Sequence, residues 1–258
     1  MKEEILTGGT INTVSRKGDV VFRSGGQWVP AVHKVLTHLQ KNKFPYSPKP
    51  LGLALDGREM VSYLNGKTIP KPWPKHMFEN DSIVQVSKML RMLHNITQDL
   101  VFPKDTIWRF ATSAKTKKQI IRHGDLSPWN TLWEGDKLVG LIDWDFAEPG
   151  DAITDLAQLA AYFVPFIGGG SWEEVGFNKE PNYKERLALI IKSYDKDYTE
   201  KDVVLALDKL HILEMSRLVR FSKKKIHPWE EWSKNGEYSK MKEEQNWLHN
   251  KFPEYFQG

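Results

Sequence analysis

The chain has 258 residues, of which 40% are hydrophobic, and it carries 37 Lys and Arg against 33 Asp and Glu, a formal net charge of +4. It contains no cysteine, which excludes a disulfide framework, a thiolate metal site and a cysteine nucleophile. The length suits one large domain or two lobes that share a cleft. No apolar run is long enough to cross a bilayer, and the N-terminal MKEEILTGG has no apolar signal core. We therefore expect a soluble, cytoplasmic protein with no membrane partner.

The positive charge is concentrated near the N-terminus. Residues 1–64 hold nine Lys and Arg against five Asp and Glu, which leaves 28 of each sign for the rest, 37 less 9 and 33 less 5. A modest local excess suits a phosphate-bearing ligand, whereas nucleic-acid binders usually carry a denser stripe of basic residues. We interpret the basic clusters at residues 114–118 and 220–225 as solvated loops or helix ends. The charge pattern therefore indicates no nucleic-acid partner.

The N-terminal residues are predicted to form antiparallel strands and one helix. Within residues 3–23, Gly8-Gly9 and Lys17-Gly18-Asp19 separate short apolar runs, which is typical of consecutive antiparallel strands. Residues 28–42 have apolar side chains at helical spacing, and Pro30 falls in the first turn, where a helix tolerates proline.

A second pair of strands follows this helix. Asp56-Gly57 predicts a hairpin between residues 51–55 and 58–64. Asn65-Gly66 and the proline-rich IPKPWP then interrupt the strand pattern. We therefore expect two units, residues 1–64 and residues 65–258.

The second unit is predicted to be mostly helical. Asp81 or Ser82 can cap a helix that ends near Asp99, and Thr199 is the predicted N-cap of a long helix. The expected helices are residues 81–99, 151–163, 184–194 and 199–221.

Polar side chains interrupt two apolar strands in the middle of the chain. The motif HGDLSPWN places Asp125 and Asn130 in one loop, and a strand at residues 137–143 ends at Asp143. Phosphoryl transfer needs a carboxylate that orients the attacking hydroxyl and accepts its proton, and oxygen ligands for Mg²⁺ on the nucleotide phosphates. Asp125 suits the first task, and Asn130 and Asp143 suit the second.

Turn residues are the alternative explanation for this motif, because Asp, Asn, Gly and Pro are common in loops. Against it stands the ordered pattern His-Gly-Asp-x-x-x-x-Asn, which chance gives on the order of 10⁻³ times in a chain of this length. The pattern therefore favours function for Asp125, Asn130 and Asp143.

HGDLSPWN followed by LIDWDFAEPGDAITDLA resembles the aminoglycoside phosphotransferase superfamily of small-molecule kinases. VVFRSGGQWVPAVHKVLTHL and GREMVSYLNG are similar to the N-terminal lobe of its uncharacterised branches. The resemblance implies an α+β, protein-kinase-like two-lobed fold, with a small antiparallel-sheet N-terminal lobe carrying one helix and a larger, mostly helical C-terminal lobe. It also implies a nucleotide cofactor, ATP or GTP, with Mg²⁺, and a small hydroxyl-bearing molecule as the acceptor.

The resemblance also implies roles for individual residues of the motif. A lone histidine is equally well explained as a hydrogen-bonded core residue, and Asp145 either assists the metal or satisfies backbone amides. The implied roles are catalysis for Asp125, positioning of the catalytic loop for His123, metal binding for Asn130 and Asp143, and bracing of the loop for Asp155.

The nucleotide half of the site departs from the family pattern. Arg23 stands where the family has a lysine, and the following helix offers His33 and Lys34 rather than a glutamate to pair with it. Residues 7–13, TGGTINT, do not match G-x-G-x-x-G. By resemblance, Arg23 binds the phosphates and the backbone of the hinge binds the adenine, the hinge being Ser62, Tyr63 and Leu64.

Two other functions are compatible with these residues, and the acceptor is open. The departures at Arg23 are compatible with a nucleotide-binding pseudokinase that regulates a partner. A metal-dependent hydrolase could use Asp125, Asp143, Asp145 and His123. Residues 171–177 and 227–238 combine tryptophan with glutamate and are candidate surfaces for an acceptor such as an amine. The sequence does not indicate an oligomeric state.

Overall fold

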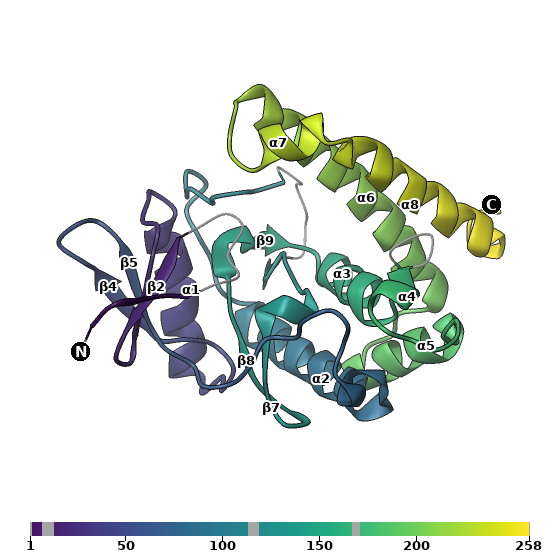
Figure 1. Cartoon of the computed structure of the whole chain (residues 1–258), viewed down its shortest axis with the longest axis horizontal. Coiled ribbons are helices and arrows are strands. Elements are labelled where there is room, and N and C mark those ends of the chain that lie inside the picture. Colours follow the sequence, from purple (N-terminus) through teal and green to yellow (C-terminus); the bar gives the residue numbers. More distant parts are fainter. Residues whose placement is uncertain (1, 7–12, 113–118, 167–170, 258) are drawn as a thin grey trace.

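The computed structural model describes residues 2–6, 13–112, 119–166 and 171–257. Figure 1 shows a sheet with one helix at the N-terminal end of the molecule and a larger, mostly helical body at the other. The expected α+β two-lobed fold is confirmed. The proposed glycine-rich turn at residues 8 and 9 and the basic cluster at residues 114–118 lie outside the described residues.

The N-terminal lobe is a five-stranded antiparallel sheet with the strand order β1-β2-β3-β5-β4. The strands are β1 (Glu4–Leu6), β2 (Val14–Lys17), β3 (Val20–Arg23), β4 (Pro50–Leu53) and β5 (Glu59–Ser62). Helix α1 (Val29–Lys41) buries Val32, Val35, Leu36 and Leu39, the residues whose spacing predicts it. The last residue of β3 and the first of β5, Arg23 and Glu59, are directly opposite each other.

The C-terminal lobe is built around two packed pairs of helices. Helix α2 (Asn80–Thr97) packs on α5 (Tyr183–Tyr194), and α3 (Ala152–Phe163) packs on α6 (Glu200–Lys223). Helix α8 (Glu237–Lys251) lies along α6, as Figure 1 shows, and contacts it. The remaining helical turns are α4 (Ser171–Glu174), α7 (Trp229–Lys234), η1 (Lys75–Phe78), η2 (Pro128–Asn130), η3 (Trp144–Phe146) and η4 (Pro253–Tyr255).

Two small hairpin-like sheets lie where the lobes meet, and they carry the polar motif. Strand β6 (Ile120–Arg122) pairs with β9 (Glu148–Gly150), and β7 (Thr131–Glu134) pairs with β8 (Lys137–Leu141). Strands β7 and β9 have no counterpart among the expected elements. The sequence of β9, Glu-Pro-Gly, has low strand propensity, so only its pairing with β6 makes it a strand.

One expected helix start is wrong. Helix α2 begins at Asn80 with Glu79 as its N-cap, rather than at Asp81 or Ser82. The Ser82 hydroxyl instead donates a hydrogen bond to the carbonyl of His76, at 2.6 Å, and so links the helix to η1. The helix therefore starts without a side-chain cap.

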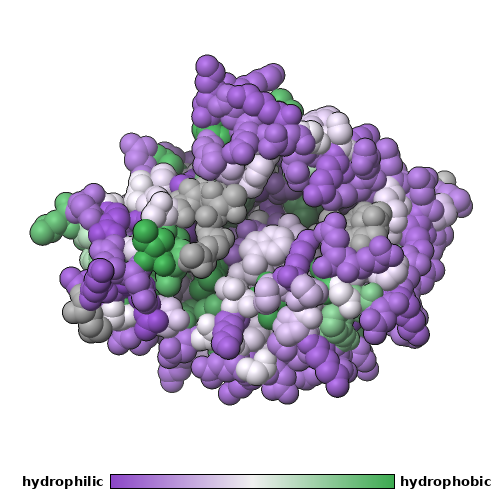
Figure 2. Space-filling view, in the orientation of Figure 1, coloured by the Kyte–Doolittle hydropathy of each residue, from purple (hydrophilic) through white to green (hydrophobic). Residues whose placement is uncertain are grey.

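A continuous apolar core runs through both lobes, and it includes Trp73, Trp133 and Trp144. In Figure 2, hydrophobic side chains gather over the sheet side of the visible face, whereas the helical side is mostly hydrophilic. The exposed apolar residues of the sheet and its first hairpin include Ile5, Leu51, Leu53 and Leu55. No helix within the described residues has the length and hydrophobicity needed to span a membrane.

The N-cap of α6 is confirmed and provides the first test. Thr199 accepts a hydrogen bond from the Asp202 amide, and Asp202 accepts one from the Thr199 amide, which together make a capping box. We expect Thr199→Ala to lower the free energy of unfolding by about 1 kcal/mol. Chemical denaturation measures this loss, and Thr68→Ala, at an exposed position, is the control. An equal effect of both substitutions would contradict the capping role.

Candidate active site

The catalytic loop begins where β6 ends and passes close to the 144–146 segment. Gly124 has φ +77°, a conformation that side chains other than glycine rarely adopt. A Cβ atom at this position would lie 2.3 Å from the carbonyl oxygen of Phe146. Position 124 therefore requires glycine for two reasons: the backbone has a positive φ, and there is no room for a side chain beside the Phe146 carbonyl.

A buried carboxylate holds this loop in place. Asp155, on α3, accepts hydrogen bonds from the His123 amide at 2.8 Å, the Gly124 amide at 3.3 Å and the Arg122 Nε atom at 3.1 Å. His94 of α2 lies 3.3 Å from the same carboxylate. Burial alone would raise the pKa of Asp155, but the His94 hydrogen bond and the Arg122 charge outweigh it and hold the pKa at about 2. The bracing role expected for Asp155 is confirmed.

Gln158 is a second brace, which the sequence analysis missed. Its Oε1 atom accepts a hydrogen bond from the Leu126 amide at 3.1 Å, and its Nε2 atom donates to the Gly124 carbonyl at 2.9 Å. Gln158 is one helical turn after Asp155, and a polar residue at that spacing on an apolar helix is the signal that could have identified it.

His123 has the contacts of a residue that positions the loop, rather than those of a general acid that transfers a proton to the substrate. The side chain is fully buried, and its Nε2 atom lies 3.1 Å from the Ile142 carbonyl. The Asp125 amide donates to its Nδ1 atom at 3.3 Å, so the ring is neutral with its proton on Nε2. Burial lowers the pKa of His123 to about 4, which agrees with a neutral ring.

The structure brings Asp125, Asn130 and Asp143 together. The Asn130 Nδ2 atom donates to the Asp125 carbonyl at 3.0 Å, and the Ile142 amide, next to Asp143, donates to the Asn130 carbonyl at 2.9 Å. Burial, followed by the negative charge of Asp143, raises the pKa of Asp125 to about 7. Asp143 has a left-handed backbone with φ +65° and precedes η3. The three residues that the motif singles out, Asp125, Asn130 and Asp143, therefore lie together in the folded chain.

The donor set of this cluster fits a magnesium ion. Because the Asn130 amide nitrogen is used by the Asp125 carbonyl, its Oδ1 atom is the group left to face a cation. The Asp143 side chain is 35% exposed and can present a carboxylate oxygen beside it. An amide and a carboxylate oxygen, completed by water and phosphate oxygens, are the ligands that Mg²⁺ prefers.

Arg23 reaches from the N-terminal lobe to carboxylates of the C-terminal lobe. Its guanidinium is buried, and the Nη2 atom lies 2.7 Å from Asp143 and 2.9 Å from Asp145. The Nη1 atom lies 3.5 Å from Glu59 on β5. Arg23 does have an acidic partner in its own lobe. The partner comes from the paired strand β5 and not from the following helix, where the family pattern predicts it.

Asp145 and Arg109 complete this ion-pair group. Arg109 pairs with Asp145 and lies over the Trp28 ring, with its guanidinium carbon 4.4 Å from the ring centroid. Because Asp145 pairs with two arginines and the His123 ring is hydrogen-bonded inside the loop, the four-residue metal set of a hydrolase is not favoured. No cluster of three His, Cys, Asp or Glu suited to a metal ion occurs among the described residues.

The predicted hinge begins at Ser62, the last residue of β5. The Tyr63 amide donates to the Asp19 carbonyl and the Ser62 amide to the Lys49 carbonyl, both at 2.8 Å. The Arg16 guanidinium covers the Tyr63 ring at 3.5 Å. The amides of Ser62 and Tyr63 are therefore both used within the N-terminal lobe.

Acidic and aromatic residues adjoin Asp125 on the side of the C-terminal lobe. Trp129 is 44% exposed, and its ring packs edge-on against Tyr162 of α3, with the centroids 5.1 Å apart. Burial raises the pKa of Tyr162, and so do four nearby carboxylates, Asp125, Glu214, Glu244 and Glu237. Burial raises the pKa of Glu244 to about 7.

These glutamates come from two helices, α6 for Glu214 and α8 for Glu237 and Glu244. Of the two surfaces that the sequence suggests for the acceptor, residues 227–238 supply Glu237. The tryptophans of these segments are core residues instead, since Trp229 is buried and Trp172 packs on the core.

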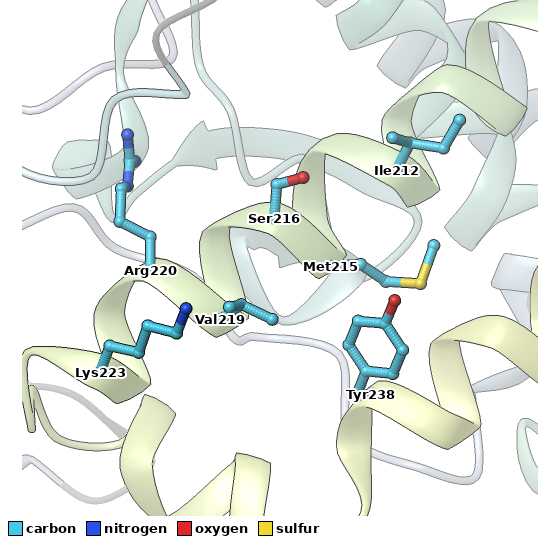
Figure 3. Close-up of a pocket in the computed structure, with 7 residues that line it drawn as sticks. All are labelled: Ile212, Met215, Ser216, Val219, Arg220, Lys223 and Tyr238. Carbon is cyan, nitrogen blue, oxygen red and sulfur yellow. The ribbon is translucent and has the colours of Figure 1, made fainter.

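A separate groove lies on the surface of α6, as Figure 3 shows. It has a volume of about 490 Å³ and is bordered by Tyr238 of α8. Apolar side chains from Ile212, Met215 and Val219 line it, and Arg220 and Lys223 lie at one end. No residue of the catalytic loop lines this groove, so it is distinct from the cluster around Asp125.

The brace on the catalytic loop provides the second test. Asp155→Asn removes a buried charge that compensates Arg122, and we expect it to lower the free energy of unfolding by about 3–5 kcal/mol. The folded-state pKa of Asp155, about 2, lies below the ordinary value of 3.8 for an aspartate side chain. Its stabilisation is therefore present above about pH 4 and is lost as the pH falls toward 2.

Chemical denaturation between pH 7 and pH 2 measures both effects. The control is Asp105→Asn, at an exposed position, which should leave the stability and its acid dependence unchanged. A variant at residue 155 as stable as the control, with the same loss of stability in acid as the parent, would refute the bracing role.

Comparison with known proteins identifies the family. The model of the family described as "Phosphotransferase enzyme family" matches residues 104–189, a range that contains Asp125, Asn130, Asp143 and Asp155. The chain is 34% identical over 200 residues to the Trifolitoxin immunity protein of Rhizobium leguminosarum bv. trifolii, and the match covers 75% of each protein.

Solved structures share the fold over nearly the whole chain. A choline/ethanolamine kinase family protein from Mesorhizobium loti superposes with a TM-score of 0.60 at 17% identity, covering 96% of this chain and 92% of that one. Amicoumacin kinase in complex with AMP-PNP, Ca²⁺ and Ami gives 0.65 at 11% identity, with coverages of 95% and 88%. The GDP complex of aminoglycoside 2′-phosphotransferase-IIIa gives 0.59 at 16% identity, with coverages of 95% and 93%. With the family model, the 34% identical relative and the clustered Asp125, Asn130 and Asp143 in agreement, the chain belongs to the phosphotransferase enzyme family.

Proposed function

We propose that this protein is a small-molecule kinase that transfers the γ-phosphoryl group of ATP or GTP to a hydroxyl of a small acceptor. The observation that carries the proposal is the convergence of Asp125, Asn130 and Asp143 at the cleft that Arg23 enters from the other lobe. Phosphoryl transfer depends mainly on positioning and electrostatic stabilisation, and these four side chains supply both.

In this proposal Asp125 orients the acceptor hydroxyl and accepts its proton. The buried setting that raises its pKa to about 7 makes it a stronger base than an exposed carboxylate. Asp155, Gln158 and His123 keep the loop rigid through five hydrogen bonds to its backbone.

The nucleotide occupies the interlobe cleft in this proposal, with its adenine against the backbone of residues 62–64. Asn130 and Asp143 hold Mg²⁺, which neutralises charge on the transferred phosphoryl group when it is bound. Arg23 offers a planar, permanently charged fork to the phosphate oxygens. Nucleotide-bound relatives of the same fold, with AMP-PNP and GDP, support this assignment.

We further propose that the acceptor is positively charged. Glu214, Glu237 and Glu244, like Asp125, carry charges that raise the pKa of Tyr162, and Trp129, which packs on Tyr162, adds an exposed aromatic face. Carboxylates and aromatic rings both stabilise cations. One relative is named for immunity to trifolitoxin, and by analogy the acceptor here is a bioactive compound that phosphorylation inactivates.

The catalytic assignment predicts the effect of a single isosteric change. Asp125→Asn should lower turnover by about 10² or more, the scale of a lost general base, and should leave nucleotide affinity within about twofold of the parent. Coupled ADP release with a panel of hydroxylated compounds measures turnover, and calorimetry measures affinity. Asp105→Asn is the control. Undiminished turnover would remove Asp125 from the mechanism. A parent that binds nucleotide without turning over any compound of a broad panel would favour the pseudokinase.

The acceptor assignment predicts a selective loss. Compared with the parent, Glu244→Gln should raise the KM of cationic acceptors by about tenfold, the loss of one charged contact, and should leave neutral acceptors unaffected. The matched control is Glu243→Gln, which changes the exposed neighbouring glutamate on the same helix. Equal KM changes for cationic and neutral compounds would count against a cationic acceptor.

A further inference from the structure

Arg23, the proposed phosphate-binding cation, is paired with a glutamate of the sheet, Glu59, rather than with a glutamate of the following helix. Arg23 and Glu59 lie directly opposite each other on β3 and β5, so their side chains share one face of the sheet. Glu59 is 1% exposed. A carboxylate buried to this extent requires positive or hydrogen-bonding partners, and it has two in the described structure, Arg23 Nη1 at 3.5 Å and His33 Nε2 at 3.0 Å.

Among the described residues, His33 is the residue of helix α1 that contacts Glu59. Its neighbour Lys34 turns away and donates to the carbonyl of Val101 at 2.9 Å. The helix therefore contributes an imidazole to the group, and the carboxylate comes from the sheet. The order of contacts, from helix to cleft, is His33, Glu59, Arg23 and then Asp143 with Asp145.

Arg23 is attracted to both lobes, and more strongly to the C-terminal one. Its contacts with Asp143 and Asp145 are shorter than its contact with Glu59, at 2.7 and 2.9 Å against 3.5 Å. Without the Glu59 charge, the guanidinium would pair with the carboxylates of the C-terminal lobe alone. One of these, Asp143, is the carboxylate that the metal requires.

We infer that Glu59 is the positioning residue of the phosphate-binding cation, and that His33 fixes Glu59 in turn. This inference rests on the proposed function, because the ligand of Arg23 is the nucleotide phosphate. Glu59 keeps the guanidinium on the N-terminal side of the cleft and leaves Asp143 to the metal. Because Arg23 and Glu59 belong to adjacent strands of one sheet, the sheet sets the position of Arg23, and the His33 hydrogen bond links α1 to this pair.

A double-mutant cycle on nucleotide affinity tests this inference. The four proteins are the parent, Glu59→Gln, Arg23→Ala and the double variant, and titration calorimetry with magnesium and ATP, then GTP, gives each Kd. We expect a Kd about tenfold higher for Glu59→Gln and about ten- to a hundredfold higher for Arg23→Ala, the range for a charged hydrogen bond. The double variant should bind no more weakly than Arg23→Ala, because Glu59 acts through Arg23.

Two further variants separate positioning from folding. His33→Ala should weaken binding by a few fold, and His33→Gln, which keeps a donor for Glu59, should restore most of it. Glu59→Asp, which keeps the charge on a shorter chain, should fall between the parent and Glu59→Gln. The control is Glu4→Gln on β1 of the same sheet, an exposed position. Thermal unfolding of every variant reports whether it is folded.

The outcomes distinguish this inference from the proposed function. A parent that binds neither nucleotide would overturn both. A parent that binds nucleotide while Glu59→Gln binds equally well would overturn the positioning role alone. Additive losses in the double variant would also overturn it, since Glu59 would then act on the nucleotide by another route.

Discussion

The buried carboxylate of Asp155 is the interaction on which the candidate active site depends. It is fully buried on α3 and accepts hydrogen bonds from the His123 and Gly124 amides and from Arg122. These bonds fix the loop that carries Asp125, and through that loop they position Asp125 relative to Asn130 and Asp143. Burial of a charge is costly unless partners compensate it, and the partners of Asp155 hold its pKa below the ordinary value.

Ion pairs join the two lobes, in addition to the continuous apolar core. Arg23 reaches from the sheet to Asp143 and Asp145, and Arg109 pairs with Asp145 from the other side. Asp143 is thereby shared between an arginine and the proposed metal. A ligand that brings both phosphate and Mg²⁺ satisfies both groups together, because the phosphate takes the guanidinium and the metal takes the carboxylate. The arrangement therefore suits a magnesium nucleotide better than either component alone.

Much of this organisation could be predicted from the sequence, because it depends on local patterns. The apolar spacing of α1 and α6, the Thr199 cap, and the motif holding Asp125, Asn130 and Asp143 are all readable over a few residues. What could not be predicted depends on tertiary contacts. Glu59 is a partner of Arg23 only because β3 and β5 pair in one register, and Gln158 reaches the loop only because α3 packs beside it. The start of α2 at Asn80 was not predicted either, and Ser82 bonds to η1 rather than capping the helix.

The central claim is that the cleft binds a nucleotide through a metal held by Asn130 and Asp143. The most direct test is titration calorimetry of ATP and GTP, with and without Mg²⁺, on the parent and on Asn130→Ala and Asp143→Ala. Each variant should fold and should lose most of the magnesium-dependent part of nucleotide affinity, because each lacks one oxygen ligand. Magnesium-dependent binding that is unchanged in both variants would contradict the claim.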